Sequence, residues 1–259
     1  MSRNRITYRL IATLAVAAAV TASAVACSSD DSESSAAKTT LNVYAAASLK
    51  KTFTEIESAY EKEHSDVDVV LNFAGSSALV NQIQQGADVD VIATADERTM
   101  DKLGDLVNTP QIFARNTLVI ATAPGNPKKI ENFASLRNGD IATVICAVEV
   151  PCGAATAQVE ENTGIDITPK SEEASVTAVL TKVTSGEADA GLVYVTDAKG
   201  VGDKVSVVSD PAFAKVVNNY PIATLKASKH QEQADEFVDL VVGEAGQQIL
   251  TGAGFSSPS

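Results

Sequence analysis

The segment Leu41-Asn42-Val43-Tyr44-Ala45-Ala46-Ala47-Ser48-Leu49 combines two different hydrophobic patterns. Its first half, through Ala45, has the composition and alternation of a β-strand. From Ser48 onward, apolar residues recur at helical spacing as far as Tyr60. The pattern predicts a strand followed directly by a helix, with Ser48 as the helix N-cap.

The same strand-then-helix pattern recurs along the rest of the chain. Further strands are predicted at 67–73, 90–94, 117–123, 141–145, 192–195, 205–208 and 220–225. Further helices are predicted at 76–86, 96–103, 154–162, 176–186, 237–242 and 245–250, with Asp96 as an N-cap. This alternation predicts an α/β fold with a mostly parallel sheet and helices on both faces. In such sheets, ligands bind beyond the carboxyl ends of the strands, at the helix N-termini.

The N-terminus predicts export. It has three arginines, an apolar run from 10 to 22, and Ala24-Val25-Ala26 directly before Cys27, the pattern of a secretory signal. Cleavage by an ordinary signal peptidase and lipidation of Cys27 both fit, although alanine stands at 24 where lipoproteins prefer leucine. The polar run after Cys27 has nothing to bury and favours a flexible tether. We therefore expect a signal at 1–26, a lipid anchor and tether at 27–40, and an extracytoplasmic protein held at the cell membrane.

Charge limits the classes of ligand. The chain has 20 Lys and Arg against 33 Asp and Glu, a formal net charge of -13, which becomes about -16 without the three arginines of the signal. Nucleic-acid binding requires a basic surface, and no cluster of Lys or Arg follows the signal, so we expect no nucleic-acid partner. Helix N-termini nevertheless attract anions without any cationic side chain. Such ends are predicted at Ser48, Ser76, Cys152-Gly153 and Val176, although a single serine before a helix is usually only a cap.

Several segments together carry a more specific resemblance. The stretch from Val43 to Leu49 resembles the first signature of the molybdate-binding proteins of bacterial ABC transporters. The similarity extends over roughly 41–255, and further segments match in the same order. These are Phe73-Ala74-Gly75-Ser76-Ser77 with Leu79 and Gln82-Ile83, Gly86-Ala87-Asp88-Val89-Asp90-Val91, Val150-Pro151-Cys152-Gly153, Val176, Gly191-Leu192-Val193-Tyr194 and Tyr220-Pro221-Ile222-Ala223.

The resemblance implies a ligand set. In that family two serines of one lobe, with two backbone N–H groups and a tyrosine hydroxyl of the other, hold the oxyanion. By motif position these are Ser48, Ser76, the N–H groups of Cys152 and Val176, and the hydroxyl of Tyr194. A small residue such as alanine is common in the family at the position of Cys152, but only the N–H is needed there. Composition alone would make Tyr194 a core tyrosine.

The resemblance also implies a fold and a role. The expected fold is the two-lobed periplasmic-binding-protein fold of type II, with 41–116 plus 219–259 as one lobe and 117–218 as the other. Each lobe would be a mostly parallel sheet flanked by helices, and the lobes would close around a hinge near 116–117 and 218–219. The implied role is capture of molybdate, or of tungstate, and delivery to an ABC permease. We expect a monomer with no cofactor, no catalysis and no metal beyond the bound oxyanion.

Cys146 and Cys152 are the only cysteines after Cys27. Export to an oxidising compartment predicts a disulfide between them. A nucleophilic Cys152 at a helix N-terminus is the rival interpretation, since that environment lowers a thiol pKa. The two histidines, His64 and His230, fall in predicted surface helical segments, so neither a base nor a metal cluster is evident. The alternatives left open are another ligand, such as sulfate, phosphate or an organic acid, an enzyme with Cys152 or Ser48 as nucleophile, and a sensor or adhesin that takes no part in transport.

Overall fold

Residues 38–258 are described by the computed structural model of this chain. The predicted signal at 1–26, the lipidated Cys27 and most of the predicted tether lie outside these residues. The tether is predicted to end at residue 40, whereas the first strand already begins at Thr39, because Thr39 and Thr40 pair with Val67 and Asp68. Within 38–258, no helix has the length and apolar character required to cross a bilayer.

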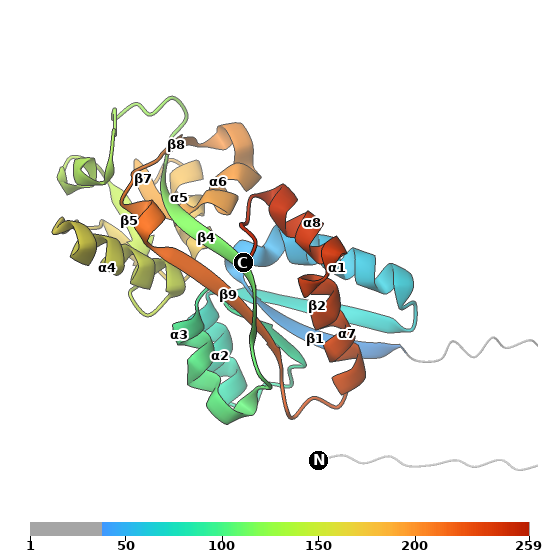
Figure 1. Cartoon of the computed structure of the whole chain (residues 1–259). Helices are drawn as coiled ribbons and strands as arrows, with labels where there is room; N and C mark the ends of the chain where they lie inside the picture. The colour runs from blue at the N-terminus through green and yellow to red at the C-terminus, as the bar shows by residue number, and fades with distance from the viewer. Residues whose placement is uncertain (1–37, 259) are drawn as a thin grey trace, which may run out of the picture. The chain divides into compact units, whose positions relative to one another are not determined.

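Nine strands form one continuous sheet in this part of the chain, in the order β2-β1-β3-β9-β4-β7-β5-β6, with β8 paired to β4 (Figure 1). Their bounds are β1 (Thr39–Ala46), β2 (Val67–Ala74), β3 (Val91–Ala93), β4 (Gln111–Thr122), β5 (Thr143–Cys146), β6 (Ser171–Glu173), β7 (Ala190–Tyr194), β8 (Ser206–Val208) and β9 (Val217–Thr224).

The helices connect these strands. The α-helices are α1 (Lys50–Glu63), α2 (Ser76–Gln84), α3 (Glu97–Met100), α4 (Pro151–Thr163), α5 (Val176–Thr184), α6 (Val195–Val201), α7 (Gln231–Val242) and α8 (Glu244–Ala253). Short 3₁₀ helices are η1 (Ala47–Leu49), η2 (Asp101–Leu106), η3 (Phe133–Arg137), η4 (Gly202–Lys204) and η5 (Phe213–Lys215). The α/β fold class is therefore confirmed, and the structure adds α6, which no pattern predicted.

The sheet is mixed, although the sequence predicts a mostly parallel one. In the first lobe β1 pairs parallel to β2 and β3, and in the second lobe β5 pairs parallel to β6 and β7. The two long strands β4 and β9 pair antiparallel to each other and to their remaining neighbours. Their direction follows from the path of the chain, because β4 leaves the first lobe and β9 returns to it (Figure 1).

The two lobes are defined here by their elements. The first contains β1–β3, α1–α3, α7 and α8, and the second contains β5–β8 and α4–α6. In the first lobe, α1, α7 and α8 pack together on one face of the sheet, where Phe53 contacts Phe113 and Phe237. A separate apolar cluster with Leu79, Ile92 and Met100 lies under α2 and α3 on the other face. Both faces are thus covered, as the alternating pattern predicts.

Local capping explains where several helices begin and end. The side chain of Asp96 accepts a hydrogen bond from the N–H of Thr99 at 2.8 Å, so its predicted role as an N-cap is confirmed. Ser175 caps α5 in the same way, with its hydroxyl 3.2 Å from the N–H of Ala178. Gly164 ends α4 with a positive φ of 67°, a conformation that glycine adopts without strain.

Candidate functional site

Ser48 lies inside the 3₁₀ helix that joins β1 to α1. Its predicted role as an N-cap is wrong. The 3₁₀ helix η1 begins at Ala47, so the N-cap residue is Ala46, which makes no side-chain hydrogen bond to the helix. The Ser48 hydroxyl instead lies 3.0 Å from the hydroxyl of Tyr220 on β9. A long-range contact therefore fixes this serine at the carboxyl end of β1.

Ser76 is the first residue of α2, with Gly75 before it as the N-cap residue. It is almost fully buried. The backbone N–H of Ala95 donates to the Ser76 hydroxyl oxygen at 3.1 Å. Because the oxygen accepts that bond, the hydroxyl proton is free to be donated elsewhere.

Cys152 follows Pro151 in the first turn of α4 and forms a disulfide with Cys146 at the end of β5. Its thiol is thus not a free nucleophile. As a first-turn amide, its N–H has no acceptor within the helix. Close packing fixes this turn, since a Cβ on Gly153 would lie 1.9 Å from the carbonyl oxygen of Ala147. The backbone around Cys152 therefore has little freedom to move.

Val176 is the first residue of α5. Because Val176 is in the first turn, its N–H has no acceptor within the helix, and the N-cap hydroxyl of Ser175 accepts from the N–H of Ala178 instead. The side chain of Val176 is buried in the main apolar core. The side chain thus anchors the residue, and its N–H is available at the positive end of the helix.

Tyr194 ends β7 and is 1% exposed. Its hydroxyl makes no hydrogen bond to any residue of 38–258 within normal geometry. The ring packs at a steep angle against Tyr220, with ring centroids 5.9 Å apart. Burial is the main reason why the pKa of Tyr194 lies well above its ordinary value, followed by the neighbouring Tyr220 and Asp197. The phenol therefore stays protonated, and a buried donor of this kind requires an acceptor.

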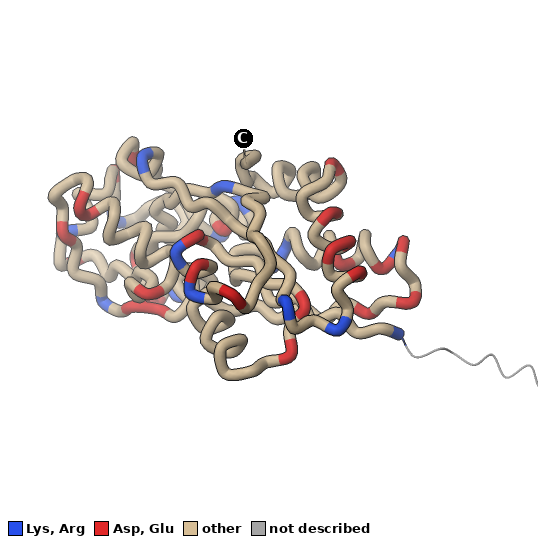
Figure 2. The backbone as a smooth tube through the Cα atoms, turned by 60° about the horizontal axis from the view of Figure 1, so that its bottom comes forward, with Lys and Arg blue, Asp and Glu red and all other residues tan. Residues whose placement is uncertain are grey.

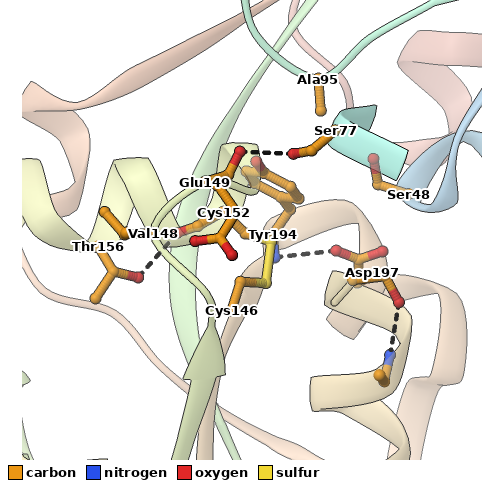
Figure 3. The surroundings of a disulfide bond; sticks show 12 residues. Ser48, Ser77, Ala95, Cys146, Val148, Glu149, Cys152, Thr156, Tyr194 and Asp197 are labelled. Atoms are coloured by element: carbon orange, nitrogen blue, oxygen red, sulfur yellow. Dashed lines mark hydrogen bonds between the residues drawn. A yellow bond between two sulfur atoms is a disulfide. The ribbon is translucent and has the colours of Figure 1, made fainter. Parts of the chain in front are cut away.

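All five predicted ligand residues line one cavity between the two lobes. Figure 3 draws three of them, Ser48, Cys152 and Tyr194, which come from η1, α4 and the end of β7. The cavity is nearly closed in this conformation, with a volume of about 10 Å³, close to the ~10–15 Å³ that a single water molecule requires. Its full lining is Ala46, Ala47, Ser48, Gly75, Ser76, Ala95, Val150, Pro151, Cys152, Val176 and Tyr194.

No lysine or arginine is among these lining residues. The N-termini of α2, α4 and α5 contribute lining residues instead, and the positive end of a helix dipole favours an anion there. Figure 2 shows Asp and Glu distributed over both lobes, with Lys and Arg scattered between them. In the described part of the chain, no three His, Cys, Asp or Glu side chains gather as they would around a metal ion. The cavity therefore presents neutral donors to a small acceptor.

Sequence reasoning missed Tyr220 as part of the site. Its hydroxyl contacts Ser48, and burial is the main reason why its pKa lies above the ordinary value. Because the phenol stays protonated, Tyr220 can donate to the Ser48 oxygen and leave the serine proton for a ligand. The segment Tyr220-Pro221-Ile222-Ala223 was matched as a family motif, but nothing local indicates that a tyrosine on β9 reaches a serine after β1.

The family can be identified from sequence. A model of the bacterial extracellular solute-binding proteins matches residues 41–256. The chain belongs to this family. Molybdate-binding protein ModA of Mycobacterium tuberculosis is 47% identical to this solute-binding protein over 251 residues, which cover 94% of this chain and 96% of the relative.

Solved structures share the fold of this solute-binding protein. The periplasmic molybdate-binding protein of Azotobacter vinelandii superposes with a TM-score of 0.74 at 22% identity, over 85% of this chain and all of that one. The sulfate-binding protein SubI of Mycobacterium tuberculosis superposes with a TM-score of 0.75 at 17% identity, over 85% of this chain and 88% of that one. Proteins named for different oxyanions thus match the fold equally well, so the fold alone does not select the anion.

Proposed function

We propose that this solute-binding protein captures molybdate outside the cytoplasmic membrane and delivers it to the permease of an ABC transporter. The observation that carries the proposal is the buried Tyr194 hydroxyl, which makes no hydrogen bond of normal geometry within residues 38–258 and belongs to a residue that lines the cavity of neutral donors. The 47% identity to a protein named for molybdate binding supports the choice of anion. Tungstate, which is nearly the same size and has the same charge, would bind as well.

The proposed ligand set has five donors. Ser48 and Ser76 donate from the first lobe, and the N–H groups of Cys152 and Val176 and the hydroxyl of Tyr194 donate from the second. Charge-assisted hydrogen bonds contribute about 1.5–3 kcal/mol each. Five of them can offset desolvation and leave roughly 8 kcal/mol, which corresponds to a micromolar dissociation constant.

The chemistry of the donors discriminates between anions. Molybdate carries only acceptors, whereas hydrogen phosphate has a proton that would face another donor, a buried mismatch of about 1–3 kcal/mol. Sulfate is also a pure acceptor but is smaller, so its rejection must depend on the size of the cavity. The small side chains of Ala46, Ala47 and Ala95 and the backbone of Gly75 set that size.

Catalysis is disfavoured by the same geometry. The sulfur of Cys152 is held in a disulfide, and the hydroxyl nearest to Ser48 belongs to Tyr220, whose raised pKa makes it a donor rather than a base. A nucleophilic serine needs an adjacent base. We therefore propose a binding protein without enzymatic activity.

Closure of the two lobes would follow ligand binding, since each lobe supplies part of the donor set. We propose the lobe boundaries 41–116 plus 219–259 and 117–218. The strands β4 and β9 cross between the lobes side by side, with Asn116 paired to Asn218 in register. Asn116 donates to Thr196 of the second lobe at 2.7 Å, and Asn218 donates to the carbonyl of Ala95 in the first lobe at 2.9 Å. This pair supports a hinge at 116–117 and 218–219.

Attachment to the membrane is proposed through a lipid on Cys27, followed by the tether. Labelling cells with a fatty-acid analogue, with Cys27→Ala as the control, tests the anchor. Loss of the label and release of the variant into the medium are expected. A monomer is expected in solution and is checked by size-exclusion chromatography with light scattering.

Calorimetry with molybdate, tungstate, sulfate and phosphate tests the ligand. Molybdate and tungstate should bind with similar affinity, and sulfate and phosphate at least tenfold more weakly. Ser48→Ala and Ser76→Ala should each weaken molybdate binding by at least tenfold, because each removes one charge-assisted bond. Ser58→Ala on the exposed face of α1 is the matched control. Tighter binding of sulfate or phosphate than of molybdate would show that the proposed ligand is wrong. Unchanged molybdate affinity in both serine variants would show that the assigned binding site is wrong.

A further inference from the structure

Two side chains of the first lobe make hydrogen bonds to the second lobe without lining the cavity. Ser77, the second residue of α2, donates to the carbonyl oxygen of Glu149 at 2.6 Å (Figure 3). Arg98 of α3 donates through one guanidinium nitrogen to the carbonyl oxygens of Val148 at 3.2 Å and Glu149 at 3.3 Å. Both acceptors lie in the second lobe, in the segment 147–150 between β5 and α4, which we call the latch loop.

The latch loop is held rigidly by its own lobe. The disulfide between Cys146 and Cys152 closes it at both ends. Within it, the N–H of Val150 donates to the carbonyl of Ala147 at 2.9 Å, and the N–H of Ala147 donates to the carbonyl of Glu173 at 2.9 Å. The carbonyl groups of Val148 and Glu149 are therefore fixed acceptors, on the same rigid unit as the Cys152 N–H that is proposed to hold the ligand.

A glycine allows the lobes to approach this closely. A Cβ on Gly75 would lie 2.1 Å from the carbonyl oxygen of Ala174 and 3.6 Å from the side chain of Val150, both in the second lobe. The backbone of Gly75 has φ -59° and ψ 137°, a conformation open to any residue. The requirement for glycine thus comes from the opposite lobe and not from the turn itself.

We infer that Ser77 and Arg98 form a latch that grips the latch loop when the cleft closes and sets the lifetime of the bound oxyanion. Neither residue lines the cavity, so the latch acts on closure and not on the ligand. The inference rests on the proposed function, because it assumes a ligand held between the lobes. Its acceptors are backbone carbonyls, so the side chains at 148 and 149 are free to vary.

The direction of the kinetic effect follows from this arrangement. The ligand enters while the cleft is open, when the latch is unmade, so the association rate should not depend on Ser77 or Arg98. Escape requires the latch to break, so its loss should appear in the dissociation rate, where most differences between related complexes lie. Arg98 is half-exposed, so its contribution should be the smaller of the two.

The test uses the purified exported protein with radiolabelled molybdate as the probe and a chase of unlabelled molybdate. Ser77→Ala and Arg98→Ala should each speed dissociation about three- to tenfold, as expected for the loss of one or two hydrogen bonds. The double variant should exceed either single one, with an unchanged association rate. Ser58→Ala and Arg137→Ala, at exposed positions away from the cavity, are the matched controls.

Gly75→Ala is a separate test of the close approach of the two lobes. It should weaken molybdate binding by at least tenfold while the thermal unfolding midpoint stays within a few degrees, because the clash arises only when the lobes meet. Gly139→Ala is the control, since a Cβ there would meet nothing within 4 Å.

The outcomes separate the latch from the proposed function. If the wild-type protein binds none of the four oxyanions, both the latch and the proposed function are ruled out. Wild-type protein that binds molybdate while Ser77→Ala and Arg98→Ala release it at the wild-type rate overturns the latch and leaves the proposed function standing. Wild-type affinity in Gly75→Ala overturns the close approach of the lobes at that residue.

Discussion

The hydroxyl groups of Ser48 and Ser76 have the same kind of hydrogen-bonding neighbour, although the two serines lie in different helices. Each hydroxyl oxygen is within hydrogen-bonding distance of another protein donor, the Tyr220 hydroxyl in one case and the Ala95 N–H in the other. Both serine protons are then free to point into the cavity. A pure acceptor such as molybdate suits this polarity, because no protein acceptor has to be displaced before it binds.

Tyr220→Phe removes one oxygen atom and tests whether the Tyr220 hydroxyl orients the Ser48 hydroxyl. Removing the phenol oxygen leaves Ser48 free to rotate, so molybdate affinity should fall about three- to tenfold. Stability should change by no more than about 1 kcal/mol, because the ring and its packing against Phe113, Tyr194 and Phe255 remain. Calorimetry and urea unfolding measure the two effects.

Tyr60→Phe is the matched control for that substitution. Its hydroxyl also makes a hydrogen bond, to the carbonyl of Gln233, but it lies outside the cavity lining. Molybdate affinity should therefore be unchanged in this variant. Equal losses of affinity in Tyr60→Phe and Tyr220→Phe would show a general effect on the core and contradict the role given to Tyr220.

At the scale of elements, three helices begin at the cavity and each start is fixed in its own way. The start of α2 follows Gly75, α4 has Pro151 in its first turn together with the disulfide, and α5 is capped by Ser175. Orienting the backbone amides before the ligand arrives reduces the entropy that binding has to offset. A cage without cations depends on this rigidity more than a cage with arginine would.

Of the three helix starts, that of α4 can be tested most directly, because its disulfide can be removed without changing the backbone. The double substitution Cys146→Ser and Cys152→Ser keeps the backbone N–H of residue 152. It should lower the free energy of unfolding by roughly 2 kcal/mol, the chain-entropy value for so short a loop. Molybdate affinity should also fall severalfold, because the first turn of α4 becomes free to move.

Urea unfolding and calorimetry check both effects of the disulfide. Wild-type protein treated with a reductant is the second form of the same test and should behave like the double variant. Lower stability with unchanged affinity would show that the disulfide supports the fold alone and does not aim the N–H of residue 152.

At the scale of the whole molecule, we expect molybdate to make the protein more compact. The proposed donor set is divided between the lobes, and β4 and β9 pair through the proposed hinge at 116–117 and 218–219. Small-angle scattering should show a smaller radius of gyration with molybdate than without it, and Gly75→Ala should show a reduced change. An identical scattering profile with and without molybdate would contradict ligand-driven closure.

Sequence reasoning predicted the elements that local patterns define. The amphipathic spacing of α5 and the Asp96 cap of α3 are local signals, and both predictions are confirmed. The residues that the resemblance selected from five separate segments line one cavity. Their roles as ligands stay a prediction.

The features that sequence reasoning missed depend on distant contacts. Ser48 was misplaced as a cap because its partner, Tyr220, is 172 residues away. The start of β4 was missed because 111–116 are held as a strand by pairing with β9. Helix α6 has seven residues and is fixed by the N–H of Tyr194 donating to the Asp197 carboxylate at 3.0 Å, a contact that no periodicity shows.

The continuous pairing of β4 with β9 at the crossing has a consequence for repeated rounds of binding and release. The pairing runs through the crossing without a gap, from Ala114 with Tyr220 to Thr117 with Val217. A two-stranded ribbon can twist, but it cannot slide without breaking its ladder of hydrogen bonds. Each round of opening and closing should therefore bring the lobes back into the same alignment, so that the proposed permease would meet the same surface each time.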